Sequence, residues 1–158
     1  MNTPEAGENL LHELDTIVAN EKDRGRALQA VAETLKRFGK HRWVGLYDVD
    51  YPAGLVRNVV WSGPGVPEYP TFPIHRGLTG AAIASRQTIN VGDVVADARY
   101  LTAFSSTQSE IVIPVFDKTG ASVVGTIDVE SETRNAFSPE IQRLLENCSE
   151  RIRALWFR

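Results

Sequence analysis

The 158-residue sequence predicts a single α+β domain, in which an antiparallel sheet of about six strands packs against helices from both ends of the chain. Apolar residues recur at helical spacing near both termini. Between them, Val- and Ile-rich runs are separated by tight turns. Tight turns join antiparallel neighbours, because parallel strands need a crossover of a dozen or more residues. We therefore expect the N- and C-terminal helices to pack on one face of an antiparallel sheet.

The elements divide this domain, residues 1–158, into three parts. Residues 10–38 are expected to form two helices, or one helix broken near Gly25. A last helix is expected over residues 139–157, with Ser138 as its N-cap and Pro139 as its first residue. The sheet and its loops occupy residues 42–131, with strand-like runs at 42–48, 55–61, 69–74, 88–91 and in a hairpin at 109–130.

Composition excludes several classes of function. The formal net charge is −3, so nothing indicates a nucleic-acid or anionic-membrane partner. The sequence has no run of 18 apolar residues, and its N-terminal residues lack the pattern of a signal peptide. The single cysteine, Cys148, falls on an apolar helix stripe, where a core role is expected, and fits a reducing compartment. We therefore expect a cytoplasmic protein.

No metal or cofactor site is expected. The three histidines, His12, His41 and His75, show no ligand spacing with one another or with Cys148. Residues 76–80 (RGLTG) precede a short helix at 81–85 and could offer backbone N–H groups to an anion. They lack the lysine of a phosphate loop, however, and a tight turn into the helix is the alternative interpretation.

The hairpin at 109–130 carries three carboxylates where a buried strand would carry apolar residues. Asp128 and Glu130 are two residues apart, so they share one face of a strand. If paired residue numbers sum to 238, Glu110 lies directly opposite Asp128, and two charges about 4 Å apart repel by about 4 kcal/mol near a surface. An odd sum would send Glu110 to the other face.

These carboxylates have two interpretations. They either face solvent on a half-exposed sheet, or they are covered and need a positive partner. Val and Ile flank them at both odd and even strand positions, which point to opposite faces, and this favours a sheet covered on both faces. The partner is then an ammonium or guanidinium group, from a ligand or from Arg42, Arg76 or Arg99. An unpaired carboxylate in such a place should have a raised pKa.

Aromatic residues near the carboxylates are also candidates. Trp43 and Tyr47 share strand parity, and Trp61 ends the neighbouring strand. Each is either a core residue or one wall of a cation site, since the face of an aromatic ring attracts a cation. The irregular stretch at 92–107 is expected to be a surface loop, and loops of this length are commonly functional.

Several short motifs are distributed over most of the chain: 43–47 (WVGLY), 76–80 (RGLTG), 86–88 (RQT), 93–94 (DV), 109–112 (SEIV) with Pro114, 125–131 (GTIDVES) and Phe137. Together they resemble GAF domains, and among these the free methionine-(R)-sulfoxide reductases. The resemblance implies a GAF-like fold with a ligand pocket on the sheet face opposite the helices. The positions that hold the amino acid substrate in that family correspond to Trp43, Tyr47, Glu110, Asp128 and Glu130, where Glu130 replaces the usual Asp.

The resemblance also implies a departure from the reductases. Their three cysteine positions correspond to Tyr69, Thr79 and Ala103 in this sequence. The reductase chemistry needs a thiolate that attacks the sulfoxide sulfur and a second thiol that resolves the sulfenic acid. Neither Thr79 nor the distant Cys148 supplies these groups, so we expect no such catalysis.

Three hypotheses follow. The first is a non-catalytic binding or sensor domain for an amino-acid-like cationic ligand, for example a free amino acid or a derivative. The second is an enzyme with altered chemistry, in which a carboxylate of raised pKa or Cys148 takes part. The third is a structural or dimerisation module with a self-filled pocket. A homodimer through the terminal helices is expected. The predicted ligand-binding residues are Trp43, Tyr47, Trp61, Thr79, Glu110, Asp128 and Glu130.

Overall fold

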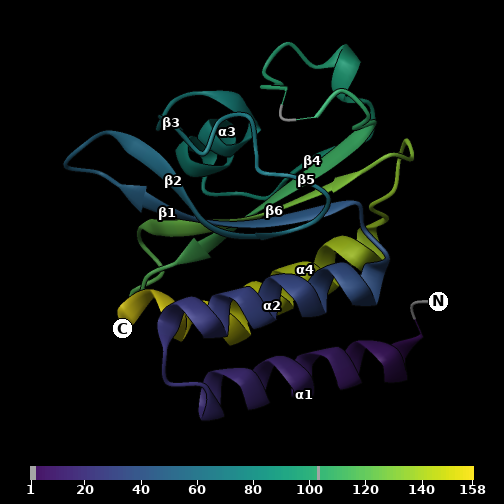
Figure 1. The fold of residues 1–158 in the computed structure, drawn as a ribbon. Helices are drawn as coiled ribbons and strands as arrows, with labels where there is room; N and C mark the ends of the chain where they lie inside the picture. The colour runs from purple at the N-terminus through teal and green to yellow at the C-terminus, as the bar shows by residue number, and fades with distance from the viewer. Residues whose placement is uncertain (1–2, 103) are drawn as a thin grey trace.

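The computed structural model describes residues 3–102 and 104–158, and across these residues the chain forms one six-stranded sheet, four α-helices and two short 3-10 helices (Figure 1). All neighbouring strands are antiparallel, in the order β3-β2-β1-β6-β5-β4. The predicted α+β fold is therefore confirmed. The strands are β1 (Trp43–Asp50), β2 (Leu55–Ser62), β3 (Thr71–Pro73), β4 (Ile89–Val91), β5 (Ser109–Phe116) and β6 (Val123–Ser131).

The long helices lie on one side of the sheet in two layers (Figure 1). α2 (Arg24–Gly39) and α4 (Pro139–Ile152) pack directly on the sheet, and α1 (Pro4–Asn20) packs on these two helices from outside. The largest hydrophobic core fills the space between the helices and the sheet. The helices are thus on one face as predicted, but α1 forms a third layer of its own.

Capping residues set the helix boundaries. Thr3 accepts a hydrogen bond from the N–H of Ala6, so α1 begins at Pro4, before the first apolar position of its stripe. Asp23 caps α2 in the same way, which separates the two N-terminal helices. Ser138 caps α4 and Pro139 is its first residue, as predicted. The chain then ends in a 3-10 helix, Arg153–Phe157, so the α-helix stops earlier than expected.

The other face of the sheet is also covered. α3 (Gly77–Ser85) lies over it, together with β3 and the segments that join β2 to β3 and β4 to β5 (Figure 1). A short 3-10 helix, Val94–Ala96, interrupts the second of these segments. The sheet therefore lies between the long helices and these covering segments, and side chains on both of its faces are buried.

The register of the hairpin differs from the one considered from the sequence alone, in which Glu110 would pair with Asp128. Glu110 lies opposite Glu130, and Asp128 lies opposite Val112, so paired numbers sum to 240. A β-bulge between Val115 and Phe116 shifts the pairing by one residue, and the connecting loop extends to Ser122. The side chain of Asp117 holds this wider loop through the N–H groups of residues 119 and 121. Because the sum is even, all three carboxylates still share one face.

None of the helices within residues 3–102 and 104–158 is long and apolar enough to cross a lipid bilayer.

Candidate functional site

The three carboxylates form a buried cluster on the sheet face that α3 covers. Glu110 comes from β5, and Asp128 and Glu130 come from the adjacent central strand β6. Glu130 is fully buried, and Glu110 and Asp128 are each only 6% exposed. Val129 and Ile127 alternate with them and enter the core on the helical side. The solvent-exposed interpretation of these residues is therefore wrong.

The cluster has almost no polar partners among the described residues. The hydroxyl of Thr107 donates a hydrogen bond to Glu130 Oε1 at 3.3 Å. Arg42 forms its ion pair with Glu132, at 2.9 Å, and not with Glu130. Within residues 3–102 and 104–158, no basic side chain forms an ion pair with any of the three, and Asp128 Oδ1 and Glu130 Oε2 have no hydrogen-bond partner. Buried charge without a partner is costly.

Burial and mutual repulsion shift the proton affinity of the cluster. Burial raises the pKa of Asp128 to about 6. Burial, and then the charge of Asp128, raises the pKa of Glu130 to about 9, although the Thr107 hydrogen bond and Arg42 oppose the rise. The pKa of Glu110 is raised well above its usual range by burial and by its two neighbours. With a pKa of about 6 Asp128 is largely ionised at pH 7, whereas Glu130, with a pKa of about 9, keeps its proton.

A small cavity of ≈ 30 Å³ adjoins the cluster. It lies between the sheet, the first turn of α3 and the two covering segments. Four of the predicted site residues line it: Tyr47, Thr79, Glu110 and Asp128. The cavity has room for about one water molecule, whereas pockets for small organic ligands usually measure 300–1,000 Å³. The other lining residues are Pro67, Tyr69, Phe72, Gly77, Leu78 and Leu101.

Trp43 does not line this cavity, although it lies on the same sheet face. Its ring is fully buried and covers Gly45, where a Cβ atom would lie 2.2 Å from the indole. The indole Nε1 donates a hydrogen bond to the carbonyl of Gly65 at 3.0 Å, and the ring contacts Phe104 at a centroid distance of 5.5 Å. Trp43 thus fixes the segment between β2 and β3 onto the sheet.

Two further predicted residues lie outside the cavity wall. Trp61 is partly buried and packs at the edge of the same aromatic cluster as Trp43 and Tyr47. Glu130 is paired with Glu110 across the strands but does not line the cavity, and its carboxylate accepts the hydrogen bond from Thr107. Sequence reasoning missed Phe72 and Leu101, because their approach to the sheet depends on loop paths. Tyr69, noted only as a replaced cysteine position, also lines the cavity. Ala103, the third such position, lies outside the described residues.

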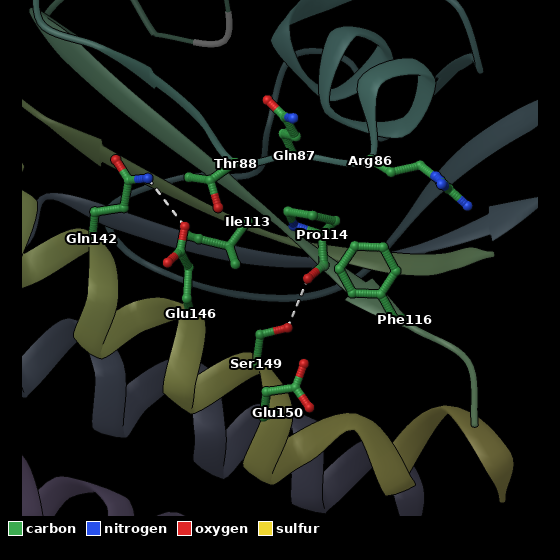
Figure 2. A pocket seen from close by; sticks show the side chains of 10 residues that line it. All are labelled: Arg86, Gln87, Thr88, Ile113, Pro114, Phe116, Gln142, Glu146, Ser149 and Glu150. Atoms are coloured by element: carbon green, nitrogen blue, oxygen red, sulfur yellow. Dashed lines mark hydrogen bonds between the residues drawn. The ribbon is translucent and has the colours of Figure 1, made fainter. Parts of the chain in front are cut away.

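A wider groove, of ≈ 390 Å³, lies on the helical side between α4, the end of β5 and residues 86–88 (Figure 2). Two of its polar side chains already have partners: Ser149 donates to the carbonyl of Pro114 at 2.7 Å, and Gln142 donates to Glu146 at 3.0 Å. No side chain that lines this groove has a buried polar atom without a partner, as far as the described residues extend. The acidic cavity is therefore the stronger candidate site.

Cys148 lies far from this chemistry in the fold. It is fully buried in the core between α4 and the sheet, on the face opposite the carboxylates. Burial raises the pKa of its thiol to about 12. A thiol of this kind is a poor nucleophile at neutral pH, because the thiolate is the reactive form.

Residues 23–154 match the GAF domain family model, and the chain therefore belongs to the GAF domain family. It is 29% identical to the Dictyostelium discoideum GAF domain-containing protein A, over 89% of this chain and 90% of that protein. The free methionine-R-sulfoxide reductase of Neisseria meningitidis, solved in complex with its substrate, is 28% identical, with a TM-score of 0.89 over 99% of this chain and 93% of that chain. The type II enzyme of Thermoplasma acidophilum is also 28% identical, with a TM-score of 0.78 over 90% and 94%.

Proposed function

We propose that this GAF domain is a non-catalytic sensor or binding protein, whose acidic cavity binds the cationic group of an amino-acid-like ligand. The observation that carries the proposal is the carboxylate cluster. Glu110, Asp128 and Glu130 are at least 94% buried, and two of their oxygens lack any hydrogen-bond partner among the described residues. An ammonium group would supply both the missing charge and the missing donors.

Binding of such a ligand requires the covering segments to move. A cavity of ≈ 30 Å³ does not hold an amino acid. Its outer wall is formed by Pro67 and Tyr69 on one segment and by Leu101 on the other, and Tyr69 is 41% exposed. We expect these segments to open for the ligand and to close again over it, because exclusion of water strengthens ion pairing.

The roles of the predicted residues follow from their positions. Asp128 and Glu110 line the cavity and are the direct partners of the cation, and Glu130, paired with Glu110 but outside the cavity lining, contributes charge when it ionises. The side chain of Tyr47 lines the cavity, where an aromatic ring can attract the cation. Trp43 and Trp61 act indirectly, by holding the aromatic cluster on which this wall rests.

A thermal-shift screen tests the proposal. The panel contains free amino acids, their oxidised forms and other cationic metabolites, each with wild type, Asp128→Asn and Glu110→Gln. We expect at least one cationic compound to raise the Tm of wild type and to have little effect on Asp128→Asn. The exposed Glu68→Gln serves as the control and should respond like wild type. If no compound raises the Tm, or if Asp128→Asn responds fully, the proposal is wrong.

The non-catalytic assignment is supported by the sequence and by the place of its one cysteine. Tyr69 and Thr79 line the cavity, and neither side chain forms a thiolate. Cys148 is buried on the opposite face of the sheet. Turnover of methionine sulfoxide with a thiol reductant should therefore be absent. Turnover that disappears in Cys148→Ser would instead establish the enzyme hypothesis.

Two observations favour other functions. The raised pKa of Glu130, about 9, leaves a protonated carboxyl group at neutral pH, as a general acid requires. The small volume of the cavity favours the structural hypothesis, in which side chains fill the pocket. The same screen separates them, because only the structural hypothesis expects no response to any compound.

We further propose that the signal passes through a homodimer formed by the terminal helices. A hollow between α1 and α4 is lined by the partly buried apolar side chains Leu11, Ile141 and Leu144, which supports this choice of surface. Sedimentation equilibrium should give twice the monomer mass. A monomer at all concentrations tested would rule the dimer out.

A further inference from the structure

A second groove, which we call the α3 groove, lies between α3 and residues 98–101 of the segment that joins β4 to β5. Its volume is ≈ 420 Å³, which is the size of a site for a small organic molecule, whereas the acidic cavity measures only ≈ 30 Å³. Glu110, Asp128 and Glu130 do not line it. The α3 groove is therefore a space of its own, separate from the carboxylate cluster.

The charged side chains that line the α3 groove are basic, although the chain as a whole has a net charge of −3. Arg76 is exposed and forms no ion pair within residues 3–102 and 104–158. Arg99 donates to Asp97, which is not a lining residue, through Nε at 3.0 Å and Nη2 at 2.7 Å. This pairing fixes the orientation of the guanidinium group and leaves Nη1 available to an oxyanion.

The wall that α3 contributes to this groove consists of small residues. Gly80 lies against the preceding turn, where a Cβ atom would be 2.5 Å from the carbonyl carbon of His75. Ala81 and Ala84 follow it along the groove and carry only methyl groups. The half-buried Tyr100 lines the groove from the other segment. Basic side chains thus lie next to a flat apolar surface, and a ligand with an anionic group on a flat apolar body matches both.

We propose that the α3 groove is a second binding site, for an organic anion whose phosphate or carboxylate group pairs with Arg76 and Arg99 while its apolar part lies against α3. The inference goes beyond the proposed function and does not depend on it, because it uses none of the clustered carboxylates.

The position of the groove also gives its occupant an effect on the acidic cavity. Gly77 and Leu101 line both spaces, and a Cβ atom on Gly77 would lie 3.3 Å from the Cβ of Leu101. This contact is part of the wall between the groove and the cavity. A molecule bound in the groove contacts both residues, so it should hold residues 98–101 against α3 and slow the hydrogen exchange of their amides.

Probe compounds of one size test the required chemistry. Phenyl phosphate, benzoate and the neutral benzyl alcohol are each titrated into the ¹⁵N-labelled protein. We expect phenyl phosphate or benzoate to shift the amide signals of Gly80, Ala84 and Leu101, more weakly at high salt because ions screen the charges. The comparison of these two anions identifies the preferred oxyanion. If neither anion shifts these signals, or if benzyl alcohol binds equally well, the site is overturned. Unchanged hydrogen exchange at residues 98–101 in the bound protein would overturn the effect on the cavity wall.

A matched pair of variants locates the binding site. Ala84 and Ser85 are neighbouring exposed residues near the end of α3, and of the two only Ala84 lines the groove. Ala84→Glu places a carboxylate in the groove, whereas Ser85→Glu adds the same charge beside it. We expect Ala84→Glu to weaken binding of the preferred anion at least about tenfold and Ser85→Glu to change it less than about twofold. Arg76→Gln, at an exposed position, should weaken it at least about fivefold. Equal affinities of the two glutamate variants, or an unchanged affinity in Arg76→Gln, would overturn the proposal.

Discussion

Replacement of the fully buried Glu130 by Gln should make the unliganded protein more stable at neutral and alkaline pH. The pKa of Glu130 is about 9 in the folded chain, against 4.5 for an ordinary glutamate. The folded protein therefore binds a proton that the unfolded chain has released. Its stability must fall as the pH rises from about 4.5 to about 9, and it stays constant with respect to this group outside that window.

The size of the effect follows from these two pKa values. Between pH 4.5 and 9, each pH unit lowers the free energy of unfolding by about 1.4 kcal/mol through this group. Relative to acidic pH, Glu130 therefore lowers the free energy of unfolding by less than about 1 kcal/mol at pH 5, by about 3 kcal/mol at pH 7 and by about 6 kcal/mol at pH 9. Gln keeps the size of the side chain and an acceptor for the Thr107 hydroxyl. Its amide N–H groups lie on the same strand face as the carboxylate of Asp128.

Thermal unfolding at pH 5, 7 and 9 measures the difference. We expect Glu130→Gln and wild type to have similar Tm values at pH 5, and the variant to be higher by roughly 6–12 °C at pH 7, with a wider gap at pH 9. Glu68→Gln, which removes an exposed carboxylate, should follow wild type throughout. Parallel Tm curves for wild type and Glu130→Gln from pH 5 to 9 would refute the assignment of a buried, protonated Glu130.

Three further predictions concern packing and reactivity. Gly45→Ala should destabilise the protein by about 2–4 kcal/mol in urea titrations, because its Cβ would lie 2.2 Å from the fully buried ring of Trp43; an unchanged midpoint would contradict this packing. Cys148 should react with a thiol reagent at pH 8 only after unfolding, since it is fully buried with a pKa of about 12; rapid labelling of the folded protein would contradict its burial. Ser138→Ala should cost about 1 kcal/mol through loss of the α4 N-cap, and no change in stability would show that the cap contributes nothing.

Much of the fold could be predicted from periodicity and capping. The stripes that begin at Leu10 and the Ser138–Pro139 pair locate helices because their signals are local. The placement of α1 in a third layer could not be predicted, because an amphipathic helix packs equally well on a sheet or on other helices. The hairpin register could not be predicted either. It depends on the bulge at Val115 and on the loop held by Asp117, which alternation alone does not reveal.

The candidate site was predictable where it lies on strands. Period two placed Asp128 and Glu130 on one face, and the even register added Glu110. Sequence reasoning failed where loops decide the contact: Leu101 and Tyr69 reach the cavity through segments without regular structure. For Trp43, strand alternation correctly predicted the sheet face on which it lies. It could not reveal that the missing side chain of Gly45 makes room for the buried ring.

Proton release on binding tests the central claim most directly. An ammonium group beside Asp128 and Glu110 should lower the pKa of the whole cluster, so protons leave as the ligand binds. Calorimetric titration with the amino acid that most raises the Tm, in two pH 7 buffers of different ionisation enthalpy, counts these protons. We expect a net release of up to about one proton per ligand, with affinity rising between pH 6 and 8. Binding without proton release, or with proton uptake, would contradict a cation site at these carboxylates.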